Sequence, residues 1–326
     1  MLKVFKGWME RYFSDEEALI FLLLLISFFA IIIGFGSVLA PVFIAIILAY
    51  LLQGGMNYCK QKGLGNLIST LIMFTLFIGL FLAILFVVIP ATISQAGQLF
   101  YELPKMLTKG QGLLMLLPER YPDLITEVQV REWTGQVGKE LASLGQWLLS
   151  FSFHSIPGAI TILIYLVLVP ILVFFFLKDS TQITRFFLSF LPKDRRLMNT
   201  IWAEMEVQIA NYIRGKVVEI IIVGGVTYIG FVIFGLQYAE LLAILVGLSV
   251  LIPYIGAAVV TVPVAVIAYF QFGYGETLFY CLLVYGIIQA LDGNVLVPLL
   301  FSETVNLHPV AIIVAVLAFG GIWGFW

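Results

Sequence analysis

The chain has 326 residues, of which 62% are hydrophobic and 11% are charged, and its formal net charge is -2. Soluble domains carry roughly 25% charged residues, so the composition predicts an all-α, polytopic membrane protein. The charge balance excludes the basic surface typical of nucleic-acid-binding proteins. Cys59, Cys281, His154 and His308 are isolated in the sequence, so we expect no disulfide framework, no metal site and no cofactor.

The first segment, residues 1–90, reads as N-terminal membrane helices. Three basic residues precede an apolar run that begins at Ala18 and is too long for a cleaved signal peptide, which predicts a retained anchor. Gly34, Gly36 and Pro41 divide the run, because proline disfavours a continuous helix. We therefore expect two helices at 18–36 and 41–53, then a span at 67–89 that ends before Pro90.

Residues 91–155 are polar enough to form an insertion outside the membrane. This insertion holds five basic and six acidic residues. Apolar residues recur in it at helical spacing and predict an amphipathic helix: Trp133, Val137, Leu141, Leu144 and Leu148. Such a stripe favours packing on a neighbouring subunit or on the membrane surface, and a ligand cradle is the alternative.

A membrane helix is expected at 156–177, kinked at Pro170, followed by an amphipathic helical segment at 178–216 with seven basic residues. Basic residues gather in cytoplasmic loops. The N-terminus and the 178–216 segment are therefore expected in the cytoplasm, and residues 91–155 are expected to be extracytoplasmic. This assignment needs two crossings before Lys60.

The last segment, residues 217–326, contains no lysine or arginine, so the charge rule gives no orientation there. We expect a span at 217–236, a broken pair at 239–270, a span at 277–299 and a last helix beginning near Pro309. The sequence stops at Trp326 within an apolar run, which favours a C-terminal tail beyond it.

The first candidate site is the break at Pro253. A proline there would free the carbonyl of Ser249, and Tyr254 and Gly256 are close enough to compensate. Two half-helices meeting at this point would form a re-entrant hairpin or a broken helix lining a transport path. The alternative is an ordinary proline kink set by packing.

The second candidate site is stronger and lies in the 277–299 span. Tyr285, Gln289 and Asp292 have i, i+4, i+7 spacing and share one helical face. Asp292 lies about 22 Å along this span, where a carboxylate needs a partner or a wet cavity. Pro298 would free the carbonyl of Asn294. The alternative is a cap at the membrane edge.

Three further residues are secondary candidates, namely Arg214, Glu219 and His308. Glu219 is more simply explained by snorkelling or by pairing with Arg214 or Lys216, and His308 by a helix start before Pro309. The sequence shows no nucleophile–base set and no phosphate-binding loop, so we expect neither an enzyme nor direct ATP coupling.

Several of these segments together resemble the autoinducer-2 exporter family, also called the PerM-like permease family. The resemblance rests on segments 174–179 (FFFLKD), 211–216 (NYIRGK), 251–256 (LIPYIG), 292–298 (DGNVLVP) and 307–309 (LHP). It implies a bacterial inner-membrane protein with about eight spanning or partly spanning helices that forms homo-oligomers. Phe176 stands where many relatives have tyrosine, a mild departure.

The resemblance leaves several functions open, because relatives are described as autoinducer-2 exporters, as sodium/proton antiporters or as proteins of cell-envelope upkeep. We expect secondary export of a small solute along the two broken segments. One alternative is sodium/proton antiport. Another is a membrane scaffold that recruits a cell-envelope enzyme through residues 91–155.

Overall fold

In the computed structural model, every regular element is helical within the residues that the structure describes. These are 16–116, 118, 126–153, 156–192, 195–252, 255–301, and positions 310, 314, 317, 318 and 321. Seven segments in this part of the chain are long and apolar enough to cross a membrane. The prediction of an all-α polytopic membrane protein is confirmed, and the helix near Pro309 falls largely outside the described residues.

The N-terminal run forms one helix, α2 (Glu16–Gln61), with Pro41 inside it. The expected division into two helices is wrong. Pro41 removes one backbone donor, whereas a break would expose several backbone groups where no water can satisfy them. Two windows of α2, Leu19–Gly36 and Val38–Gln61, are each long enough to span. Both windows count among the seven candidate spans, so the pair of crossings before Lys60 stays a prediction.

Proline also fails to end the next helix. α3 (Asn66–Ala83) continues through a π-helical turn, η1 (Ile84–Val88), into α4 (Ile89–Leu114), with Pro90 at the start of α4. A π-turn bonds each carbonyl to the amide five residues on, which accommodates the missing donor of Pro90 without a break. The expected end before Pro90 is therefore wrong, although a helix does cover the expected span.

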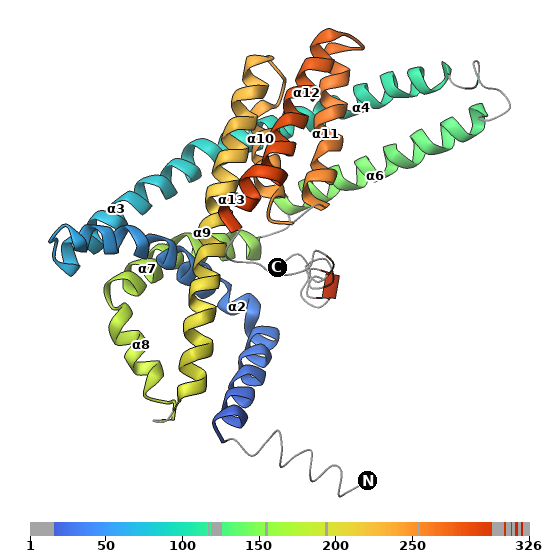
Figure 1. Cartoon of the computed structure of the whole chain (residues 1–326). Coiled ribbons are helices and arrows are strands. Elements are labelled where there is room, and N and C mark those ends of the chain that lie inside the picture. The colour runs from blue at the N-terminus through green and yellow to red at the C-terminus, as the bar shows by residue number, and fades with distance from the viewer. Residues whose placement is uncertain are drawn as a thin grey trace, which may run out of the picture. The chain divides into compact units, whose positions relative to one another are not determined.

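The remaining helices follow the predicted order (Figure 1). The 156–177 span is confirmed as a helix, and the amphipathic 197–212 stretch and the 217–236 span form one long helix. The bounds are α6 (Glu127–Phe153), α7 (Ile156–Lys178), α8 (Ser180–Leu188), α9 (Arg196–Ile233), α10 (Ala239–Ser249), α11 (Ile255–Phe272), α12 (Glu276–Leu291), η2 (Asp292–Leu296) and α13 (Val297–Phe301).

The chain divides into two compact units. Unit 1 comprises residues 1–80, 165–218 and 296–326, and unit 2 comprises 81–164 and 219–295. In unit 1, Phe74 of α3 meets Phe174 of α7 with ring centroids 5.1 Å apart. The Thr70 hydroxyl, fully buried, donates to the Asn66 carbonyl at 2.9 Å. The aromatic contact thus connects α3 with α7, whereas the Thr70 hydrogen bond lies within α3.

Unit 2 combines a helical hairpin with a small helical bundle. α4 and α6 pack against one another as the hairpin, α4 also contacts α10, and α10, α11 and α12 follow as neighbours in the chain (Figure 1). The predicted amphipathic helix in the insertion is confirmed as α6. Two residues of its predicted stripe, Trp133 and Val137, are about half exposed, so this part of the stripe does not pack inside the unit.

The turn between α9 and α10 is fastened by side chains from other helices of unit 2. Gln271 accepts a hydrogen bond from the Gln237 amide at 2.7 Å and donates to the Gly235 carbonyl at 2.8 Å. Gln95 of α4 accepts from the Leu241 amide in the first turn of α10 at 3.0 Å. Burial and a hydrogen bond to Glu102 raise the pKa of Tyr238, which therefore stays a neutral donor.

Two short reversals complete the bundle, one between α10 and α11 and one between α11 and α12. α10 has 11 residues, a length of about 16 Å that covers half of a ~30 Å hydrocarbon core. α10 and α11 pack against each other, so they form a hairpin of separate helices. The predicted break is confirmed in the residues on either side of it, and a simple proline kink is wrong.

Candidate functional site

Tyr285 is a buried residue of α12 in unit 2. Its side chain is 3% exposed, and its hydroxyl is 3.0 Å from the Thr261 hydroxyl of α11. The Tyr285 ring also lies 6.0 Å from the ring of Phe231 in α9, centroid to centroid. Tyr285 therefore joins three helices through one polar and one aromatic contact.

Two further polar residues follow Tyr285 on the same face of this helical segment. The side-chain nitrogen of Gln289 is buried and has no hydrogen-bond partner within the described residues. Asp292 follows at the start of η2 and is half-buried. Burying a polar group without a partner costs roughly 1–3 kcal/mol, so the sequence retains Gln289 at an energetic cost. This part of the predicted face is therefore polar and partly enclosed.

Asn294 and Pro298 lie apart from that face. Asn294 is exposed, and its side-chain nitrogen donates to the Ala290 carbonyl at 2.8 Å. The amide of Asn294 thus satisfies a backbone group in the irregular turn. Pro298 is exposed in α13, which belongs to unit 1. We infer that both residues determine the shape of the helix and do not line the enclosed polar surface.

At the break between α10 and α11, Ser249 and Gly256 make contacts with backbone carbonyl groups. The Ser249 hydroxyl donates to the Val246 carbonyl at 2.7 Å. The Ser249 carbonyl, expected to be free, accepts from the Ile252 amide at 3.1 Å, because the chain turns before Pro253. A Cβ atom on Gly256 would overlap this same carbonyl. Pro253 and Tyr254 themselves lie outside the described residues.

The secondary candidates separate into different environments. Glu219 is 2% exposed in unit 2, so its carboxylate does not snorkel to water. In unit 1, the Arg214 guanidinium lies 5.7 Å from the centre of the Tyr50 ring. Lys216 lies 5.1 Å from the centre of the Phe301 ring. His308 falls outside the described residues.

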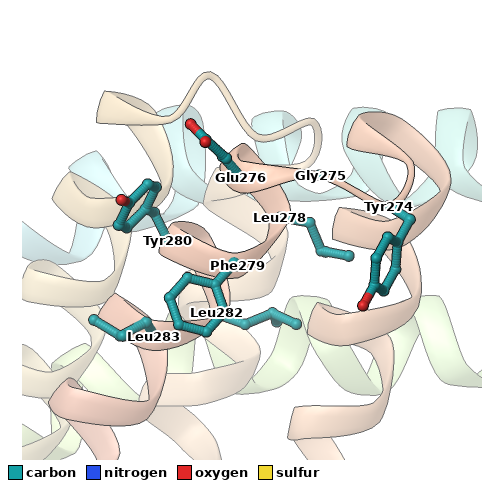
Figure 2. Close-up of a pocket in the computed structure, with 8 residues that line it drawn as sticks. All are labelled: Tyr274, Gly275, Glu276, Leu278, Phe279, Tyr280, Leu282 and Leu283. Carbon is teal, nitrogen blue, oxygen red and sulfur yellow. The ribbon is translucent and has the colours of Figure 1, made fainter.

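A surface hollow of about 710 Å³ lies elsewhere in unit 2, at the start of α12 (Figure 2). Its walls are mostly aromatic and aliphatic, and Tyr274, which lines it, is 98% exposed. Tyrosine is enriched where membrane helices meet water. None of the predicted site residues lines this hollow, so we interpret it as a lipid-facing surface at a helix end.

The sequence matches a known protein family over most of its length. The profile described as "AI-2E family transporter" matches residues 19–326. The chain belongs to this family. It is 47% identical to "Putative permease PerM" of Escherichia coli strain K12 over 326 residues, which cover all of this chain and 92% of that protein.

More distant relatives extend over most of the chain as well. "Putative transport protein YueF" of Bacillus subtilis is 29% identical over 90% of this chain and 81% of its own length. "Putative transport protein YrrI" of the same organism is 27% identical over 88% of this chain and 81% of its own length. As an AI-2E family transporter, the chain is a membrane-embedded member of a permease family and not of an enzyme family.

In unit 2 of this AI-2E family member, the sequence interpretation missed an enclosed polar residue. Thr227 of α9 is 0% exposed, and its hydroxyl has no hydrogen-bond partner within the described residues. The available signal was a threonine between Gly224 and Gly230 in an otherwise apolar stretch. That pattern by itself is also typical of ordinary close helix packing.

Proposed function

We propose that this chain is a secondary transporter that exports a small polar solute, with the polar face of α12 in unit 2 lining the path. The observation that carries the proposal is the buried Gln289 side-chain nitrogen, which has no hydrogen-bond partner among the residues that the structure describes. It lies on a membrane-length apolar helix one turn before Asp292. Polar and ionisable residues in such helices are costly and mark solute or ion pathways.

The π-turn supports the same location. η2 begins at Asp292, directly after α12. π-turns inside α-helices are frequent at functional sites, because they displace side chains and backbone groups from the regular pattern. Asp292 is the carboxylate best placed to bind a cation or carry a proton, so coupling of export to a proton or sodium gradient is part of the proposal. The alternative function is sodium/proton antiport.

The test is efflux from proteoliposomes loaded with autoinducer-2, erythritol and ²²Na⁺. We expect the wild-type chain to release at least one of these, and Asp292→Asn to slow that release about ten-fold or more, equivalent to ~1.4 kcal/mol. Glu276→Gln, at the start of the same helix, is the matched control. Equal rates for Asp292→Asn and Glu276→Gln would remove Asp292 from the path, and unchanged flux after both ion gradients are collapsed would exclude coupling.

Placement in the cell is part of the same proposal. We place the protein in the bacterial inner membrane with residues 91–155 extracytoplasmic and the N-terminus cytoplasmic, as the distribution of basic residues predicts. We also propose a homo-oligomer. The exposed side chains of Val128, Trp133 and Val137 on α6 supply apolar surface for a contact with another subunit.

A scaffold that recruits a cell-envelope enzyme is the second candidate, because the same α6 surface could bind another protein. Deleting residues 100–148 removes most of the α4–α6 hairpin. We expect solute efflux to fall when the hairpin is absent, since the deletion removes Glu102, whose hydrogen bond with Tyr238 helps hold the turn before α10. Undiminished efflux together with loss of a co-purifying envelope protein would instead favour the scaffold.

A further inference from the structure

Thr227 differs from six other helical threonines of this protein in what its hydroxyl bonds to. Six threonines donate to the carbonyl four residues earlier at 2.7–3.0 Å: Thr70, Thr92, Thr108, Thr134, Thr200 and Thr261. This bond is the usual way in which a threonine hydroxyl is satisfied inside a helix. Thr227 does not make it, although its side chain is fully buried.

The helix register places Thr227 opposite Gln289. α9 and α12 run antiparallel, since three reversals of the chain separate them. A Cβ on Gly230 would lie 3.6 Å from side-chain atoms of both Val284 and Ile288, and the next residue, Phe231, meets Tyr285. Positions 230 and 286 are therefore level. Moving three residues back along α9 and three forward along α12 brings Thr227 level with Gln289.

Thr227 lies on the face of α9 that contacts α12, and Gln289 lies on the face of α12 that contacts α9. Thr227 lies one turn before Gly230 and Phe231, which contact α12, and Gln289 lies one turn after Tyr285, which contacts α9. The two side chains are not bonded to each other, and the described residues provide neither the Thr227 hydroxyl nor the Gln289 nitrogen with another partner. Two unsatisfied polar groups thus occur at one level of one helix interface.

We propose that Thr227 and Gln289 are opposite walls of a solute-binding site that takes a hydroxyl group of an uncharged solute. A hydroxyl group accepts a hydrogen bond from the amide and exchanges one with the threonine hydroxyl, whichever end of the amide faces it. A cation does not satisfy an amide N–H donor. This inference rests on the proposed transport function and adds a residue, a helix and a ligand chemistry to it.

The unsatisfied groups predict opposite effects on stability and function. Removing a polar group that is buried without a partner relieves a desolvation cost. Thr227→Val, which keeps the shape of the side chain, should leave the melting temperature of the ligand-free protein in detergent unchanged or raise it by about 1–3 °C. Ser69→Ala in unit 1 is the matched control, because the Ser69 hydroxyl is also buried without a partner in the described residues.

The experiment combines melting, efflux and thiol labelling. We expect Thr227→Val and Gln289→Leu to slow erythritol efflux roughly five- to ten-fold, and Thr227→Ser and Ser69→Ala to retain it. A Thr227→Cys variant lacking Cys59 and Cys281 should react with a small water-soluble thiosulfonate, and erythritol should slow the reaction.

A lowered melting temperature for Thr227→Val would identify a structural hydrogen bond to bound water and overturn the site, as would Thr227→Cys that does not react or is not protected by erythritol. Failure of the transport proposal is distinguishable from these outcomes. It would show as no efflux of any solute by the wild-type protein, whereas melting and protection are measured without transport.

Discussion

Gly256→Ala should abolish the folded α10–α11 hairpin. The new Cβ would overlap the Ser249 carbonyl oxygen, a backbone atom that cannot move unless α10 and α11 separate. Overpacking of this kind typically costs 1–3 kcal/mol and occasionally more, and here we expect ~3 kcal/mol or more. In detergent the variant should melt far below the wild type or fail to elute as a monodisperse protein.

Gly286→Ala is the control for that result. Gly286 lies inside α12, and no atom within 4 Å meets a Cβ built on it. Alanine is the better helix former by about 1 kcal/mol, so Gly286→Ala should be neutral or stabilising. If Gly256→Ala and Gly286→Ala melted at the same temperature, the close contact between residues 256 and 249 would be wrong.

Gly247→Ala should weaken the contact between α9 and α10 within unit 2. A Cβ at residue 247 would lie 3.1 Å from the Ile220 carbonyl oxygen and 3.2 Å from the Gly224 Cα atom. Both are backbone atoms, so the two helices must move apart. We expect a loss of about 1–3 kcal/mol, seen as a lower melting temperature, and slower efflux because α9 carries Thr227.

The reciprocal substitution gives a graded comparison. A Cβ on Gly224 would lie 3.4 Å from the Ala243 carbonyl oxygen and 3.5 Å from the Gly247 Cα atom, which is ordinary van der Waals contact. Gly224→Ala should therefore destabilise less than Gly247→Ala. The reverse order of melting temperatures would show that the two helices approach each other differently. Membrane helices use small residues in this way to bring their backbones together.

The sequence predicted the helices better than their ends, and proline explains the difference. Pro41 and Pro90 were expected to interrupt helices, but both lie inside continuous helical stretches. In hydrocarbon a helix that continues past a proline leaves fewer backbone groups unsatisfied than a break does. The break before Gly256 was predicted correctly, and there a glycine in backbone contact accompanies the proline.

The sequence predicted only those residues of the candidate site that lie on one helical segment. The i, i+4, i+7 spacing placed Tyr285, Gln289 and Asp292 on one face, and it could not name the helix opposite. Thr227 and its bonding are set by the register between α9 and α12, which depends on the three reversals between them. Similarly, the role of Gly256 against Ser249 is a contact between two helices that no spacing within one helix reveals.

The two π-turns share a position that changes how substitutions near them should be compared. η1 ends two residues before Pro90, and η2 ends two residues before Pro298. Each wider turn holds one residue more than an α-helical turn, and one residue corresponds to about 100° of rotation. A helical wheel drawn through either proline without a one-residue shift would assign downstream residues to the wrong face. Alanine or cysteine scans across these segments should therefore show a phase slip in their periodicity.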